Sequence, residues 1–242
     1  MRTFMLTFLF VAFTGAVADD SQFSSQEELG KWFTYYYLES GPDRVGAAIR
    51  YMSESGALEE ANALPGIFGF LSGFFTSNPN EVKKITSELE DLPDNHFSVV
   101  LLGFWYANLP NSQTEVYQYL DSRKNLEDQL SYLRTGKPMA LHEIPLEQGP
   151  WVLDALWGEF FATGRSKPVE RIAEALPWIE VKGDIDRLLV GGAAKWSLSS
   201  NAYQHERVKE ILVSLSKRNP NNQQLAQVLS QAAQYEVEKA NN

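Results

Sequence analysis

The 242-residue sequence contains few of the residue arrangements that catalysis or metal binding requires. It has no cysteine, which excludes a thiol nucleophile, and its three histidines, His96, His142 and His205, lie far apart in the chain. A helical zinc site of the H-E-x-x-H kind needs two histidines four residues apart. No G-x-S-x-G elbow, P-loop or dinucleotide fingerprint occurs. We therefore expect neither a metal nor a cofactor, and we assign no catalytic residue.

Two carboxylates near tryptophans leave one enzymatic alternative open. Asp154 and Glu159 lie close to Trp151 and Trp157 in a segment with helical spacing. Enzymes that cleave glycosidic bonds use such acidic side chains beside the sugar. The alternative function is therefore a cell-wall or glycan-cleaving enzyme with an acidic residue in a Trp-lined groove. Acidic residues are more common on exposed helix faces, which favours a non-catalytic interpretation.

An aromatic run near the N-terminus and two basic residues are candidates for partner binding. The run from Trp32 to Tyr37 includes Tyr36 and covers every side of its predicted helix, so it forms either a docking surface or a cap on the fold. Arg187 and Lys195 lie two helical turns apart and either receive an acidic partner together or form a solvated face. The candidate partner-binding residues are Trp32, Tyr36, Asp154, Arg187 and Lys195.

The N-terminus predicts export. Residues 1–18 combine Arg2, an apolar stretch and the small residues Ala16-Val17-Ala18, which is typical of a signal peptide cleaved after Ala18. The lack of cysteines and of Asn-x-Ser/Thr sequons favours a bacterial periplasm or a secreted location. The net charge of −10 disfavours nucleic acid and anionic membranes as partners and otherwise indicates solubility.

The rest of the sequence predicts an all-α fold in a single domain, residues 19–242, with a possible joint near residues 125–150. Apolar residues recur at helical spacing between Gly, Pro and Asn breakers, and no segment shows the alternation of a strand. Ser25 with Glu28, and Ser112 with Glu115, predict capping boxes. Leu64 to Phe75 and Phe97 to Leu109 are too short to cross a bilayer, which takes roughly 20 residues, so we expect buried helices without a stable membrane anchor.

The two halves of the chain align with each other at an offset of about 85 to 92 residues, which is the mark of an internal repeat. The alignment pairs Gly73 with Gly158 and Trp105 with Trp196, and we expect both tryptophans in the core. It predicts a four-helix unit that is used twice.

The stretch from Trp196 to Asn222 resembles the tetratricopeptide repeat and its helical-hairpin relatives. Val208, Leu212 and Leu215 match the apolar positions of the second helix of that repeat, and Pro220 matches its closing turn. The resemblance implies antiparallel helical hairpins stacked as an α-α superhelix with a concave binding surface. The leading hypothesis is thus an exported, non-enzymatic helical-repeat protein that binds a protein or peptide in the periplasm or secreted space.

Overall fold

The computed structural model describes residues 23–240, with side chains to residue 239, and within them every regular element is a helix. The predicted signal peptide lies outside the described residues. The all-α prediction is confirmed for the described part of the chain. The α-helices are α1 (Gln26–Tyr35), α2 (Val45–Glu54), α3 (Leu64–Ser77), α4 (Val82–Glu88), α5 (Asp94–Tyr106), α6 (Ser112–Ser122), α7 (Lys124–Leu130), α8 (Trp151–Thr163), α9 (Ser166–Ala173), α10 (Ile185–Gln204), α11 (Glu206–Arg218) and α12 (Gln223–Ala240).

One of the two predicted capping boxes forms in altered form, and the other does not form. Ser25 caps α1 by accepting a hydrogen bond from the backbone N–H of Glu28 at 3.1 Å, while the Glu28 carboxylate accepts the N–H of Ser24 rather than that of Ser25. Ser112 is the first residue of α6 and not its cap. Its buried hydroxyl donates to the carbonyl of Phe104 at 2.8 Å, because α6 begins directly beneath the end of α5.

The two strongly apolar segments form α3 and α5, and both are buried as expected. Phe70, Phe74 and Val100 have almost no exposed surface, and they belong to one continuous hydrophobic core. These helices lie between other helices on more than one side, which explains why their sequences are apolar around most of their circumference. The core therefore runs through the middle of the molecule.

Helices α3 and α8 pack together more closely than ordinary side chains would allow. A Cβ added to Gly69 of α3 would lie 2.1 Å from the carbonyl oxygen of Ala155, and one added to Gly158 of α8 would lie 2.0 Å from the carbonyl oxygen of Gly66. Gly73 lies against Glu159 one turn further on, so the two helices run in the same direction along their contact. Glycine is required here because the backbones touch.

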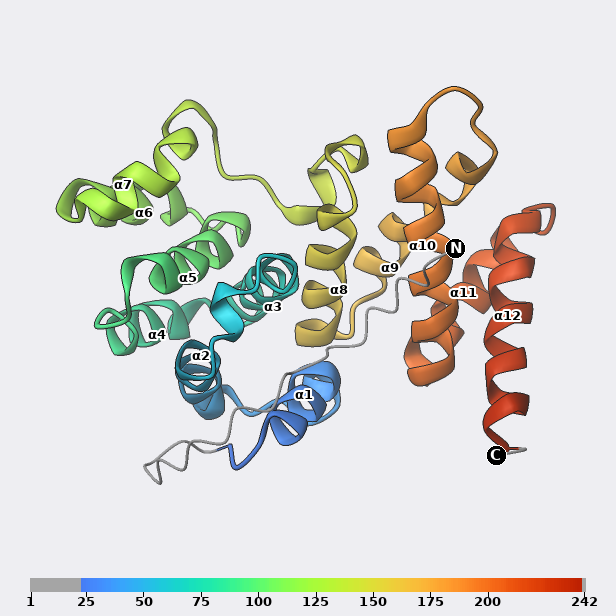
Figure 1. Cartoon of the computed structure of the whole chain (residues 1–242), viewed down its shortest axis with the longest axis horizontal. Helices are drawn as coiled ribbons and strands as arrows, with labels where there is room; N and C mark the ends of the chain where they lie inside the picture. Colours follow the sequence, from blue (N-terminus) through green and yellow to red (C-terminus); the bar gives the residue numbers. More distant parts are fainter. Residues whose placement is uncertain (1–22, 241–242) are drawn as a thin grey trace.

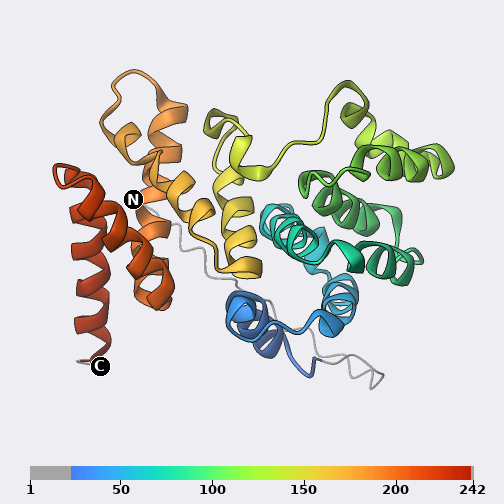
Figure 2. The ribbon, with the colours of Figure 1, turned by 180° about the vertical axis from the view of Figure 1, so that it is seen from behind.

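The order of the helices in space differs from their order in the chain. From left to right in Figure 1 the order is α7, α5, α3, α8, α10 and α12, and the view from behind shows the same neighbours from right to left (Figure 2). A sequential stack would place α8 beside α6 or α7, but in the described part of the chain α8 packs on α3 instead. The two halves thus extend outward from a shared centre at α3 and α8.

Residues 125–150, where the sequence suggests a possible joint, form the connection that returns the chain to this centre. It contains most of α7 and short 3-10 turns at Ser131–Thr135, Leu141–Glu143 and Leu146–Gln148. Leu141, Ile144 and Leu146 are buried in the core, and the last two turns pack against α8. The end of the connection is therefore fixed to α8 by apolar contacts.

Candidate partner-binding surfaces

Three of the exposed large hydrophobic residues of the described chain lie close together on α10 and form an apolar stripe. Ile185, Leu188 and Leu189 are 72%, 44% and 58% exposed, and their spacing places them on one side of the helix. The core side of α10 carries Val190 and Ala194, which lie roughly 140° to 180° around the helix from Ile185 at 100° per residue. The stripe therefore points away from the core.

On the same side of α10, the stripe is followed by Gly192, which has no side chain, and then by Trp196. A Cβ on Gly192 would meet no atom within 4 Å, so this position opens to solvent, whereas Gly191 packs against the backbone of Trp178 and Ile179. Trp196 follows on the stripe side and is only partly buried. The expectation of two core tryptophans is confirmed for Trp105, which is 3% exposed, and is wrong for Trp196. We call Ile185, Leu188, Leu189 and Trp196 the α10 stripe.

Arg187 and Lys195 contact neighbours on different segments of the chain. The Arg187 guanidinium donates to Glu147 at 3.0 Å and lies over the ring of Trp178, whereas Lys195 donates to the side-chain carbonyl of Gln227 on α12 at 2.7 Å. The two side chains therefore contact different neighbours, and the structure supports the solvated face rather than a shared site for an acidic partner.

Trp32 and Tyr36 lie in the N-terminal cap of the fold. The Trp32 ring packs against Phe23 at 5.2 Å and Phe70 at 5.6 Å, and Tyr36 is only 2% exposed. Burial raises the pKa of the Tyr36 phenol to about 12, and its hydroxyl has no hydrogen-bond partner among the described residues. Of the two alternatives for the aromatic run, the structure supports the cap.

Asp154 and Glu159 lie on different sides of α8, since five residues correspond to a rotation of roughly 140° in an α-helix. Burial raises the pKa of Asp154 to about 6 and that of Glu159 to about 7, with the positive charge of Arg165 opposing the shift at Glu159. Trp151 packs on Phe68, and Trp157 stacks on Phe161 at 6.1 Å. The structure does not bring this pair of carboxylates together.

A polar groove of about 600 Å³ lies between α4 and α6. Its lining consists of charged, hydroxyl and amide side chains, with Tyr119 as the one aromatic. Thr86 and Ser122 bond to carbonyls of their own helices, whereas the amides of Asn111 and Gln118 have no side-chain partner among the described residues. The lining residues are Lys83, Thr86, Ser87, Asn111, Thr114, Glu115, Gln118, Tyr119 and Ser122.

The sequence contained a signal for the α10 stripe but not for its exposure. Residues 185, 188 and 189 have the spacing of one helical face, yet Val190, Ala194 and Leu198 form a second apolar face on the same helix. Periodicity cannot tell which of two apolar faces is buried. No sequence pattern predicts the groove between α4 and α6, because hydroxyl and amide side chains are common on exposed helix faces.

No protein-family model, no curated protein and no solved structure matches the chain. Among residues 23–240, no helix combines the length and apolar character needed to cross a membrane. Within the same residues, no group of three or more His, Asp and Glu side chains is placed to hold a metal ion. The described residues offer surfaces for binding: the α10 stripe and the groove between α4 and α6.

Proposed function

We propose that this chain is an exported helical-repeat protein without enzymatic activity, and that it binds another protein or a peptide in the periplasm or secreted space through the α10 stripe. The observation that carries the proposal is the exposure of Ile185, Leu188 and Leu189 side by side on α10. Single exposed apolar residues are common on soluble proteins, but a contiguous group of this kind is typical of an interaction site.

The energy available from the stripe is sufficient to anchor a partner. Fully burying a large aliphatic side chain contributes roughly 1.5 to 3 kcal/mol, and a partner would gain roughly half of that at each of these partly exposed residues. Three such side chains lie beside Trp196, and tryptophan is among the residue types that contribute most to the affinity of protein interfaces. A partner segment that presents its own apolar side chains on one helical face is the best fit.

We propose further that the domain consists of two related four-helix units of tetratricopeptide-like hairpins, joined through their first helices. The succession α3, α4, α5 and α6 corresponds to the succession α8, α9, α10 and α11, and the aligned residues Gly73 and Gly158 both lie at the contact of α3 with α8. In such an arrangement α5 is the third helix of the first unit and α10 is the third helix of the second unit. The α10 stripe then lies on a helix with a counterpart in the first unit.

Crosslinking in the native envelope tests the binding function. The mature chain from Asp19 would carry a photoreactive amino acid at position 188 in one sample and at position 237 in another. Val237 is a suitable control, because it is 61% exposed on α12 and is not part of the stripe. We expect one protein to be captured from position 188 and not from position 237.

A pair of double variants provides the second part of the test. Ile185→Glu with Leu189→Glu should abolish capture of that protein, and Leu38→Glu with Val237→Glu, which changes two other exposed apolar residues, should leave it intact. Equal capture by all variants would disprove binding through the α10 stripe. Hydrolysis of a glycan by the mature chain that is lost in Asp154→Asn or Glu159→Gln would instead establish the enzymatic alternative.

A further inference from the structure

His205 lies in an aromatic cage at the junction of α10 and α11. It is 1% exposed, and rings surround it at centroid distances of 4.8 Å for Tyr35, 5.5 Å for Phe161, 5.8 Å for Tyr37 and 5.9 Å for Phe160. Its Nδ1 is 3.2 Å from the Tyr37 hydroxyl, while its Nε2 is buried without a hydrogen-bond partner among the described residues. A buried imidazole with one ring nitrogen that lacks a hydrogen-bond partner is uncommon, because buried polar atoms normally form hydrogen bonds.

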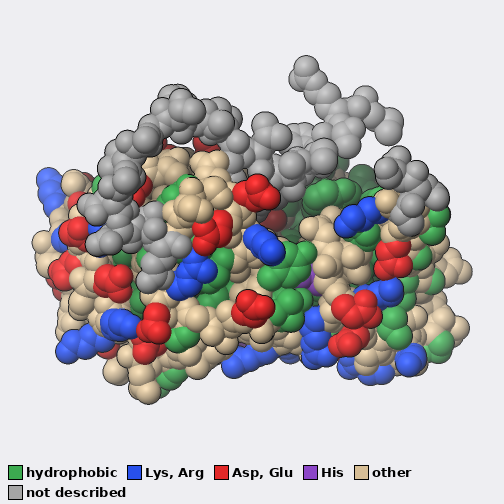
Figure 3. All heavy atoms as spheres, turned by 90° about the horizontal axis from the view of Figure 1, so that it is seen from below, with side chains coloured by type: hydrophobic (Ala, Val, Ile, Leu, Met, Phe, Trp, Pro, Cys, Tyr) green, Lys and Arg blue, Asp and Glu red, His purple; other side chains and the backbone are tan. Residues whose placement is uncertain are grey.

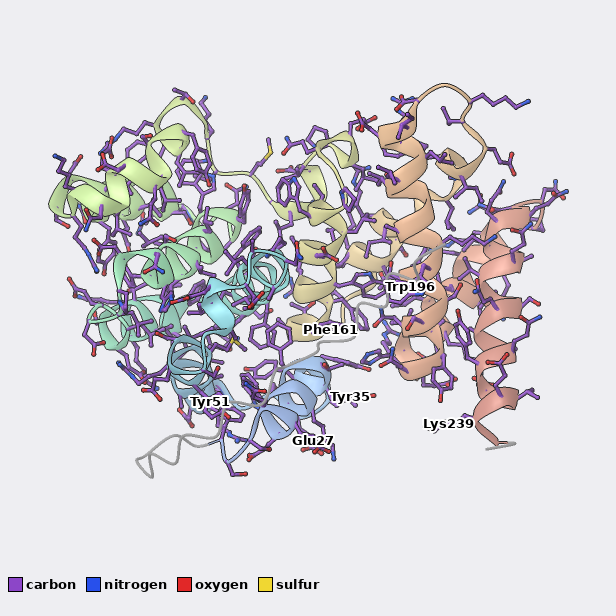
Figure 4. All side chains as sticks on the ribbon, viewed as in Figure 1. Glu27, Tyr35, Tyr51, Phe161, Trp196 and Lys239 are labelled. Carbon is purple, nitrogen blue, oxygen red and sulfur yellow. The ribbon has the colours of Figure 1, made fainter. Side chains whose placement is uncertain are left out.

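The cage connects segments that are far apart in the chain. Tyr35 ends α1, and Tyr37 lies in the 3-10 turn that follows it (Tyr36–Leu38), 168 residues before His205. Figure 4 shows Tyr35 and Phe161 directed toward the end of α10, and Figure 3 shows hydrophobic side chains with a histidine near the middle of the underside. The cage therefore fastens the N-terminal segment to the C-terminal helices.

The contact of this turn with α8 is close. Gly164, which ends α8 with φ of +62°, would place a Cβ 2.8 Å from the Tyr37 ring, so a side chain here would force that ring to shift. Phe33 of α1 also meets the Phe161 ring at 6.2 Å. The N-terminal segment thus covers apolar surface of α8 that would be exposed if the segment moved away.

The charged groups near the cage do not neutralise a histidinium. From α11, Arg207 donates to Glu210 at 3.1 Å and approaches the carbonyl of Gly164, and α8 contributes only Phe160 and Phe161. From α1 and its turn the facing titratable groups are the phenols of Tyr35 and Tyr37. No described carboxylate bonds to His205, and burial lowers its pKa to about 4.

We propose that His205 is an acid-sensitive latch, which holds the N-terminal segment on α8, α10 and α11 while its imidazole is neutral and releases that segment when it is protonated. The cage excludes water, and the imidazolium requires solvent or an anion that the described cage lacks. Release would leave the core of the two units in place and would expose Phe161 together with Phe33.

The size of the effect follows from proton linkage. With a pKa of about 4 in the closed state and 6.5 in the open state, acidification raises the opening constant, and the rise approaches tenfold per pH unit midway between these two values. Asp154 and Glu159 do not account for such opening. Their raised pKa values mean that acidification favours the folded, protonated form of both carboxyls.

Hydrogen exchange measured by NMR tests the latch, because it detects openings that are rarely populated. Exchange rates of amides in α1 and in the turn Tyr36–Leu38, divided by the intrinsic rates at each pH, give the opening constant. Between pH 6.5 and 4.5 we expect an increase of about 40-fold in the wild type and none in His205→Phe, which keeps an aromatic ring in the cage. Amides of α5 and α12 should show no such increase, and His142→Gln should behave like the wild type.

Three results would overturn the proposal. The first is a wild-type opening constant that does not change with pH, and the second is an increase that persists in His205→Phe. The third is an equal increase in α1, α5 and α12, which would indicate global unfolding. If His205→Phe does not fold, the titration of the wild-type imidazole, followed by its NMR signals, provides the test. A His205 that titrates at its ordinary pKa without loss of exchange protection in α1 would also disprove the latch.

Discussion

The α-carbon of Gly69 on α3 lies so close to the carbonyl oxygen of Ala155 on α8 that an added Cβ would be 2.1 Å from that oxygen. This contact joins the two halves of the chain, because α3 belongs to the first predicted unit and α8 begins the second. Backbone atoms on both sides leave no flexible side chain that could move aside. The stability of the whole domain should therefore depend on these glycines.

We expect Gly69→Ala or Gly158→Ala to lower the free energy of unfolding by about 2 to 4 kcal/mol, because the added methyl group must separate α3 from α8. Gly30→Ala is the matched control. Gly30 lies within α1, where an added methyl group would meet no atom within 4 Å, and the substitution should stabilise the protein by up to about 1 kcal/mol through helix propensity. Urea unfolding followed by circular dichroism measures all three variants.

Glu159 should make stability depend on pH. Because its pKa rises to about 7 on folding from an ordinary value of 4.5, the folded state binds the proton more tightly, and this stabilisation is full below pH 4.5 and lost as pH rises through 7. Glu159→Gln should remove that dependence and stabilise the protein at pH 8 by about 1 to 3 kcal/mol. Thermal unfolding at pH 5 and pH 8, with the exposed Glu39→Gln as control, checks this. A wild type and Glu159→Gln with the same pH profile would contradict it.

Two tyrosine substitutions should have opposite effects. The buried hydroxyl of Tyr36 has no partner among the described residues, so Tyr36→Phe should be neutral or stabilising by up to about 1 kcal/mol. The Tyr117 hydroxyl donates to the carbonyl of Leu133 and accepts from Gln113, so Tyr117→Phe should cost about 1 kcal/mol. Chemical unfolding of both proteins would show whether the phenol at position 36 is unpaired, and equal losses would speak against it.

Charges on the α10 stripe should not affect folding. Ile185→Glu with Leu189→Glu should change the free energy of unfolding by less than about 0.5 kcal/mol, because both side chains are exposed. Val190→Glu, on the buried side of the same helix, should destabilise the protein by several kcal/mol. Thermal melts of these two proteins distinguish a binding surface from a misassigned core face, and a large loss in the double variant would identify the latter.

Much of the fold could be predicted from the sequence, because local signals determine where each helix begins and ends. Helix α8 begins at Trp151 directly after Pro150, and Gly164 ends it in the left-handed conformation. The capping box at Ser112 failed for a non-local reason, since α5 engages that hydroxyl through the carbonyl of Phe104. Local signals are thus reliable until another helix competes for the same polar group.

The arrangement of the helices and the candidate surfaces could be predicted only in part. Gly158 and Gly73 align as equivalent positions of the predicted repeat, but the alignment does not show that both lie at the contact between α3 and α8. Apolar helix faces of similar composition do not identify the faces on which they pack. Arg187 and Lys195 share a helix, yet their partners Glu147 and Gln227 come from different segments. The neighbouring segments decide which side chains meet. The sequence does not reveal how these segments are placed relative to one another.

The outward arrangement of the two halves from α3 and α8 bears on how such a protein can change in evolution. Because α7 and α12 lie at opposite outer edges, a hairpin added or lost at either edge would leave the central glycine contact undisturbed. In a sequential stack an insertion in the middle shifts everything after it, whereas here an insertion between α7 and α8 lengthens only the returning connection. Relatives of this chain should therefore differ in length mainly at their outer helices and in that connection, and should retain the small residues of α3 and α8.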